Sequence, residues 1–308
     1  MTVLAFDTSN YTTSVAVFDG AQGHNVSHLL DVEQGSLGLR QSDALFAHVK
    51  RLPELTDRLF SDIGTVYLDA IGVSTRPRAV EGSYMPCFLA GESQARVLGA
   101  ALGVPVYPFS HQQGHIAASL FSSDHMELME KPHLAWHLSG GTTELLYVTP
   151  EGVSVRAERI GGTTDISAGQ LIDRTGKLLG LPFPAGKHID ALSAGATDKQ
   201  TFRVKVHGTE FSLSGVQNKV EAYHTGNAAE TAAYALRCLI GAIVTATKNA
   251  LREYPVEAVV FAGGVASNSM LRSACAALPA VFCPPQYATD NALGTAVLTW
   301  RAHHAAGL

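Results

Sequence analysis

Short apolar runs alternate with longer amphipathic stretches along this chain, and that alternation indicates strands interleaved with helices. The runs expected as strands contain few polar residues, as in strands buried on both faces of a sheet. In the first half, strands are expected at Val3–Phe6, Ser14–Phe18, Ala70–Val73 and Val104–Tyr107. Helices are expected at Asp43–Phe60 and Gly91–Leu102. The pattern predicts an α/β protein.

Two predicted hairpins carry small, hydroxyl-rich tips. The first two strands are joined by a polar bend at Asp7–Thr13. The same arrangement returns later, where Leu134–Leu138 and Leu145–Val148 flank the bend Ser139–Thr143. One such hairpin opens each half of the chain, so the two halves are expected to be related.

A glycine-rich junction follows in the second half, where the strand pattern Val259–Phe261 passes through Ala262–Gly264 into a helix expected over Ala266–Leu278. Glycines at such a turn let backbone amides approach an anion, although a plain tight connection is also open for this junction alone. Together with the hairpins, it suggests two related lobes closing on a nucleotide, as in actin-like ATPases and sugar kinases. The chain has no GxxxxGK[ST] motif and no GxGxxG motif after a strand.

Composition narrows the class of protein. The chain has 308 residues, of which 46% are hydrophobic and 16% charged, which excludes a disordered protein. A net charge of −5 argues against a stand-alone binder of nucleic acid, so any such contact is expected to be local or shared with a partner. Four cysteines without a CxxC pair favour neither a disulfide scaffold nor a thiolate zinc site. No signal peptide or membrane span is expected, and the predicted location is the cytoplasm.

Histidines four residues apart provide a candidate metal site. His111 and His115 follow Ser110, a suitable N-cap, so both imidazoles are expected on one helix face. Because two other pairs share this spacing, including His24 and His28 in a polar stretch expected as a loop, ordinary surface or core histidines remain an open interpretation. A zinc peptidase of the HExxH type needs a glutamate beside the first histidine, and Gln112 cannot act as that base, which argues against proteolysis.

Two further side chains could complete a cation site. His137 falls inside an apolar strand just before the Ser139 bend, where a buried imidazole needs either a hydrogen-bond partner or a metal. Asp290 is expected at the start of the last helix, as an N-cap or as a ligand. Histidines with one carboxylate and no thiolate would suit Zn(II) or Fe(II) with an open coordination position.

These motifs, taken in order, resemble those of the TsaD family, the tRNA threonylcarbamoyladenosine synthases, also called peptidase M22-like. The similarity covers nearly the whole chain. It comprises the Asp7-Thr-Ser start, His111-x-x-x-His115, Ser139-Gly-Gly, Asp165–Leu181, Pro184-Ala-Gly, Phe211-Ser-Leu-Ser-Gly215, Gly263-Gly-Val-Ala-Ser-Asn268 and Thr289-Asp-Asn291.

The resemblance implies an actin-like ATPase (ASKHA) fold with two lobes around a nucleotide cleft. The first lobe is expected over residues 1–130, completed by 290–308, and the second over 131–289 with a helical insertion near 161–235. The implied metal ligands are His111, His115 and Asp290, with His137 as a fourth of altered type. The implied adenine-nucleotide residues are Ser139, Gly140 and Gly141 at the phosphate, Asp165 and Gly169 over the nucleotide, Gly186 and Asp190 at the ribose, and Gly264 and Asn268 at the adenine. The catalytic positions are predicted at Asp7 and Thr142.

The implied reaction is an acyl transfer. Threonylcarbamoyl-AMP would give its threonylcarbamoyl group to N6 of a tRNA adenosine beside the anticodon, with one divalent transition metal, Fe(II) or Zn(II), at the site. The resemblance also implies a smaller paralogous TsaB-like subunit and an ATPase as partners, and no membrane.

This chain departs from the family pattern on the catalytic and acceptor side. Tyr11 and Thr12 stand where many members carry an Asp-Glu pair, Thr142 replaces a His or Asn, and Gln217 replaces a lysine. Two other functions therefore stay open. One is a carbamoyl transferase of the same fold with a small-molecule acceptor, and the other is a non-catalytic nucleotide-binding subunit of a modification complex.

Overall fold

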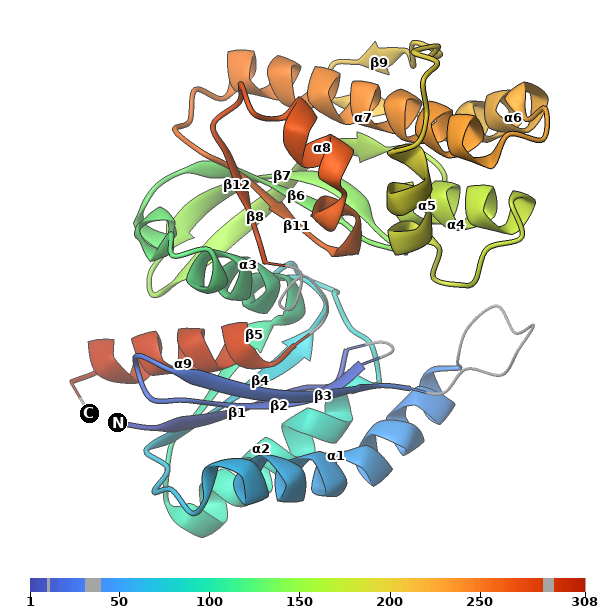
Figure 1. The fold of residues 1–308 in the computed structure, drawn as a ribbon. Coiled ribbons are helices and arrows are strands. Elements are labelled where there is room, and N and C mark those ends of the chain that lie inside the picture. The colour runs from blue at the N-terminus through green and yellow to red at the C-terminus, as the bar shows by residue number, and fades with distance from the viewer. Residues whose placement is uncertain (10–11, 31–39, 285–290, 308) are drawn as a thin grey trace. The chain divides into compact units, whose positions relative to one another are not determined.

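The chain folds into two compact units. The computed structural model describes residues 1–9, 12–30, 40–284 and 291–307, and Figure 1 draws them as a ribbon. The first unit comprises Met1–Lys131, Thr149–Ala157 and Asp290–Leu308, and the second comprises Pro132–Val148 and Glu158–Thr289.

The first unit is built on a five-stranded sheet of order β3-β2-β1-β4-β5. Its elements are β1 (Val3–Asp7), β2 (Thr12–Phe18), β3 (Gly23–Leu29), α1 (Gln41–Ile63), β4 (Ala70–Arg76), α2 (Phe88–Leu102), β5 (Val106–Ser110), α3 (His111–Ser122), the 3₁₀ turn η1 (Met126–Glu130) and α9 (Leu293–Ala305). Strand β1 pairs antiparallel with β2 and parallel with β4, and β4 pairs parallel with β5.

Helices cover both faces of this sheet, with α1 and α2 on one face and α3 and α9 on the other (Figure 1). Leu52, Leu55 and Leu59 recur on one side of α1 and pack in one core with Leu4 and Phe6 of β1. Since every residue of β1 and β2 is buried, the run of apolar residues seen in the sequence is what a doubly covered strand requires.

The second unit repeats this plan and enlarges it. Its elements are β6 (His133–Leu138), β7 (Thr143–Glu151), β8 (Ser154–Thr163), α4 (Ala168–Leu178), α5 (Gly186–Ser193), β9 (Val206–His207), β10 (Glu210–Phe211), α6 (Ser214–Tyr223), α7 (Ala228–Glu253), β11 (Val259–Ala262), the 3₁₀ turn η2 (Gly264–Ser267), α8 (Ser269–Ala274) and β12 (Ala280–Phe282). The sheet order is β12-β11-β6-β7-β8-β10-β9. Within it, β6 pairs antiparallel with β7 and parallel with β11, as β1 pairs with β2 and β4.

The turn between β7 and β8 belongs with the first unit. Residues 149–157 pack there, whereas the second lobe was expected to contain all of 131–289. The side chain of Gln113 donates to the carbonyl of Val155 at 2.9 Å, and that of Arg301 donates to the carbonyl of Val153 at 3.0 Å. These bonds fix the turn against α3 and α9.

Helix α7 is the central core helix of the second unit. It packs with α4, α5 and α6, and its buried residues join one apolar cluster with Trp136 and Phe211. Among the described residues, α7 alone is long and apolar enough to cross a membrane, and 61% of its most apolar window is buried inside the protein. Burial in this core accounts for its composition.

Two local expectations differ from the structure. His24 and His28, expected in a polar loop, lie in β3, which pairs with β2 along its whole length. The helix expected over Ala266–Leu278 is split, because Asn268 ends the η2 turn and its side chain caps the new helix α8 by accepting from Leu271 N at 2.9 Å.

Candidate nucleotide-binding and metal-binding sites

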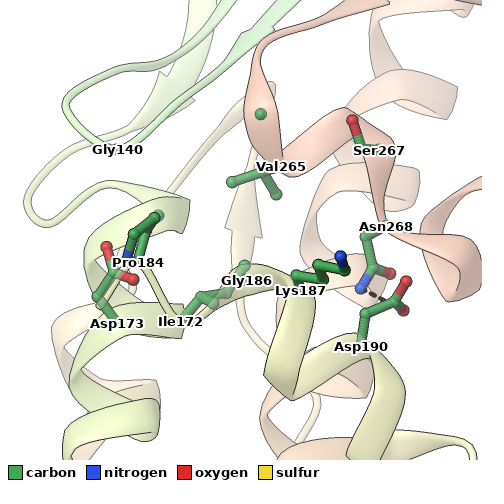
Figure 2. Close-up of a pocket in the computed structure, with 12 residues that line it drawn as sticks. Gly140, Ile172, Asp173, Pro184, Gly186, Lys187, Asp190, Val265, Ser267 and Asn268 are labelled. Atoms are coloured by element: carbon green, nitrogen blue, oxygen red, sulfur yellow. Dashed lines mark hydrogen bonds between the residues drawn. The ribbon is translucent and has the colours of Figure 1, made fainter. Parts of the chain in front are cut away.

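The second unit contains a cavity of about 460 Å³, a volume typical of small-ligand sites. Figure 2 shows its lining, which comes from the β6–β7 bend, from α4 and α5, and from the turn after β11. The lining residues are Gly140, Gly169, Ile172, Asp173, Pro184, Gly186, Lys187, Asp190, Gly264, Val265, Ser267 and Asn268. Six of the nine predicted nucleotide residues are in this set: Gly140, Gly169, Gly186, Asp190, Gly264 and Asn268.

The β6–β7 bend is closed on itself and fastened to α4. Ser139 N donates to Thr142 O at 2.8 Å, and Thr142 N donates to Ser139 Oγ at 3.0 Å. Ala168 N at the start of α4 donates to Thr143 Oγ1 at 2.7 Å. Thr142, predicted as catalytic, is therefore part of the turn that holds the bend in shape, while Ser139 and Gly141 are not among the cavity-lining residues.

The glycines around the cavity divide into two kinds. At Gly169 a Cβ would lie 2.5 Å from Gly140 Cα, and at Gly263 it would lie 2.2 Å from Leu138 O, so close backbone packing requires both glycines. Gly140, Gly186 and Gly264 line the cavity, yet a Cβ on any of them would meet no protein atom within 4 Å. Protein packing does not demand glycine at these three positions, whereas close approach of a ligand would.

Asp190 and Asn268 form a fixed polar pair in the cavity wall (Figure 2). Asn268 Nδ2 donates to Asp190 Oδ1 at 2.8 Å, while Asn268 Oδ1 accepts from Leu271 N. Ser269 N donates to Asp190 Oδ2 at 3.1 Å, and Ser269 Oγ donates to Asp190 Oδ1 at 2.8 Å. Both side chains are held by the start of α8 and need no rearrangement to meet a ligand.

Asp173 lines the cavity, although it is not among the site residues predicted from the sequence. Its carboxyl group accepts a hydrogen bond from Ala185 N at 2.8 Å, which links α4 to the start of α5. Burial raises the pKa of Asp173 above its ordinary value, against the smaller opposing effect of this hydrogen bond. Helical periodicity could have found it, because residues three and four positions after Gly169 share its helix face, and these are Ile172 and Asp173.

Asp165, predicted to help shape the nucleotide site, is not among the residues that line the cavity. Its carboxylate accepts from Leu213 N at 2.8 Å and from the hydroxyls of Ser212 and Ser214 at 2.5 and 2.6 Å. Partial burial alone would raise the pKa of Asp165, but these donors outweigh it and hold the pKa well below its ordinary value. Asp165 therefore anchors the residues between β10 and α6.

In the first unit, β1 ends beside the start of α3. Ser110 caps α3 in a reciprocal capping box with Gln113, and His111 is the first helical residue. His111 Nδ1 lies 2.8 Å from Oδ2 of Asp7, and Ser9 N donates to Asp7 Oδ1 at 2.9 Å. The rings of His111 and His115 stand edge to face with centroids 4.3 Å apart, as the predicted helix face requires.

This arrangement suits a metal-binding histidine. A carboxylate that accepts from Nδ1 fixes the tautomer and leaves Nε2 as the nitrogen that coordinates a metal. Asp7 is 1% exposed, so it meets this requirement as a buried orienting group for His111. The donor set of two imidazoles fits the predicted transition metal.

The other two predicted ligands are Asp290 and His137. Asp290 falls outside the described residues, as does Tyr11, which stands where many family members carry an acidic residue. His137 lies in the second unit on β6, half-buried and opposite Glu144 of β7. Within the described ranges, no group of three or more histidine, cysteine or acidic side chains is placed to hold a metal ion. The role of these residues as ligands stays a prediction.

Solved structures confirm the class of fold. HypF in its phosphate- and nucleotide-bound form matches with a TM-score of 0.63 and 13% identity, over 98% of this chain and 46% of HypF. The activator of 2-hydroxyisocaproyl-CoA dehydratase from Clostridium difficile, with bound ADPNP, matches with a TM-score of 0.57 and 12% identity, over 100% of this chain and 97% of that protein. At these identities the likeness concerns the fold alone, and the chain has the actin-like ATPase fold.

Sequence relatives define the family. Residues 34–297 match the family model described as TsaD, tRNA N6-adenosine threonylcarbamoyltransferase. Relatives of that name from Lacticaseibacillus casei (strain BL23) and Streptococcus suis (strain 05ZYH33) are each 32% identical, over 88% and 94% of this chain and 81% and 89% of theirs. The chain belongs to this family of tRNA-modifying acyltransferases.

Proposed function

We propose that this protein transfers the threonylcarbamoyl group from threonylcarbamoyl-AMP to N6 of the tRNA adenosine beside the anticodon, in the cytoplasm. The observation that carries the proposal is the cavity of the second unit, where three glycines that packing does not require stand beside the fixed Asp190–Asn268 pair. Family membership supplies the substrate class.

The cavity residues would bind the adenylate half of the donor. Backbone amides at the bend of Gly140 would face the phosphate, and Asp190 would accept hydrogen bonds from ribose hydroxyls. Gly264 leaves room for a flat base, and Asn268 is fixed beside it. Because these groups are already held by hydrogen bonds within the protein, donor binding costs little reorganisation.

His111, His115 and Asp290 would hold the divalent metal, with His137 as the proposed fourth ligand. Asp7 acts through His111 and is a positioning residue, because its carboxylate is buried against Nδ1 of His111. The metal, Fe(II) or Zn(II), would polarise the carbamoyl group of the donor.

The transfer itself forms one bond and breaks one. The N6 amine of the adenosine attacks the carbamoyl carbon, the bond from that carbon to the phosphate oxygen breaks, AMP departs with the electron pair, and the amine loses a proton to solvent. No nucleophilic side chain is required. The chain would work with tRNA, a smaller TsaB-like subunit and an ATPase, the partners that the family resemblance implies.

The test supplies threonylcarbamoyl-AMP and unmodified ANN-decoding tRNA to the purified protein, with its partner subunits present, and measures the modified nucleoside by mass spectrometry. We expect modified tRNA and one AMP released per modification. AMP release without modified tRNA would support the small-molecule acceptor instead. Neither product, together with retained AMP binding, would support a non-catalytic nucleotide-binding subunit.

A further inference from the structure

Lys187 is the one cationic side chain among the described residues that line the cavity of the second unit. It stands on the first turn of α5, directly after Gly186 and three residues before Asp190. Figure 2 shows Lys187 and Asp190 rising from the same helix, with Asn268 across from them. A residue at this place can touch whatever fills the cavity.

The spacing of Lys187 and Asp190 would ordinarily give an ion pair. Oppositely charged residues three apart on a helix are neighbours on its surface. Here the Asp190 carboxylate is turned to the start of α8, where Asn268 Nδ2 and the N–H and hydroxyl of Ser269 donate to it. Lys187 forms no ion pair with any residue in the described ranges. Its ammonium group is therefore available to a ligand.

The charges of the lining favour an anionic ligand only if Lys187 takes part. In the part of the lining that the structure describes, the other charged residues, Asp173 and Asp190, are carboxylic. Without Lys187 these would repel a phosphate, whereas the ammonium group of a cavity-lining lysine attracts it. Asp190 is already surrounded by hydrogen-bond donors, and burial makes Asp173 easier to protonate.

We propose that Lys187 is a specificity-determining residue that binds the phosphate of the adenylate and makes the cavity prefer a nucleotide to the corresponding nucleoside. This inference rests on the proposed nucleotide site. It adds the Lys187 ammonium group as the feature that distinguishes a charged ligand from an uncharged one. A charge-assisted contact of this kind is worth about tenfold in affinity.

The test compares AMP with adenosine by titration calorimetry on the full chain. We expect Lys187→Ala to weaken AMP binding about tenfold and to leave adenosine binding unchanged. Lys187→Arg should retain most of the AMP affinity. Rising salt should reduce the preference for AMP in the unaltered protein, but not in Lys187→Ala. Because Lys187 is exposed, the variants should melt at the same temperature as the unaltered protein.

The matched control is Lys177→Ala, an exposed lysine on α4 that does not line the cavity. It should leave both affinities unchanged. If Lys187→Ala binds AMP as the unaltered protein does, or loses AMP and adenosine equally, the role of Lys187 is overturned while the nucleotide site stands. If the unaltered protein binds neither compound, the proposed site and this inference both fail.

Discussion

The two units contain separate sheets of the same basic strand arrangement, but the end of the central strand has a different role in each. In both, the central strand pairs antiparallel with the next strand of the chain and parallel with a later one. In the first unit β1 ends in Asp7, a buried carboxylate that holds His111. In the second unit β6 ends in a glycine bend that contributes backbone to a cavity.

The cavity of the second unit depends on what is inserted between its third and fourth shared strands. Helices α4 and α5 lie there, and they provide Gly169, Asp173, Gly186, Lys187 and Asp190 to the lining. The corresponding interval of the first unit contains α1, a helix whose apolar side belongs to the core. The repeated sheet therefore supports both units in the same way, while the chemistry comes from the residues at the strand ends and from the inserted helices.

The largest effect is expected in the first unit. Changing His111 and His115 together to alanine should reduce the bound transition metal from about one per chain to none, because two of the three proposed imidazole ligands are removed. Metal content is measured by inductively coupled plasma mass spectrometry on the purified protein. The affinity for AMP should remain, because its proposed residues belong to the second unit.

The control for this pair is His125→Ala, which removes a partly exposed histidine that contacts Glu127 in the same unit. It should keep the metal. A stoichiometric metal in the double variant would contradict the proposed role of His111 and His115 as metal ligands.

The next effect concerns the bend of the second unit. Gly169→Ala places a Cβ 2.5 Å from Gly140 Cα and 2.6 Å from Ser139 O, and these backbone atoms cannot move without displacing the bend. We expect AMP affinity to fall about 100-fold and the free energy of unfolding to fall by about 1–3 kcal/mol. Calorimetry and thermal melting measure the two losses.

Gly141→Ala is the matched change in the same bend, because a Cβ there meets no atom within 4 Å. It should cost little stability, since glycine is not required by packing at that position. Equal losses of stability in the two variants would mean that the close contact between α4 and the bend does not require glycine at position 169.

The sequence predicted the central strands well, because strands buried on both faces must be apolar throughout. The edge strand β3 was missed: only Val26 of its seven residues is buried, and its pairing with β2 provides the order that its own pattern lacks. The division of the expected helix at Asn268 was also missed, since a side-chain cap inside a helical pattern is hard to distinguish from an ordinary polar position.

In the site, short glycine motifs identified the backbone that borders the cavity, but not all the side chains around it. Asp173 and Lys187 come from helix faces, and a motif comparison does not consider which residues share a face. Asp165 was predicted at the nucleotide because it belongs to the same sequence motif as Gly169. Its hydrogen-bond donors Ser212 and Ser214 are distant in sequence. Only the fold brings those donors to its carboxylate.

A smaller effect is expected from the Asp190–Asn268 pair. Asp190→Ala and Asn268→Ala should each weaken AMP binding about tenfold, because each removes a proposed ligand contact and releases its partner. The double variant should lose less than the product of the two single losses, since the residues act together. Unchanged calorimetric affinity in both single variants would remove the nucleotide site from the second unit.

The smallest effect is expected at Asp165, which lies off the cavity in the same unit. Its folded-state pKa is depressed, so its contribution to stability is present above the unfolded pKa, about 4, and is lost as the pH falls further. Asp165→Asn should lower the free energy of unfolding by only about 1 kcal/mol at pH 7, because solvent weakens the interactions of this exposed side chain. The variant should also lose less stability in acid than the unaltered protein does. Denaturant titrations at pH values from about 3 to about 7 measure the loss of stability at pH 7 and its dependence on pH. AMP affinity at pH 7 should stay close to that of the unaltered protein, and a loss as large as that of Asp190→Ala would show that anchoring the residues between β10 and α6 is part of nucleotide binding.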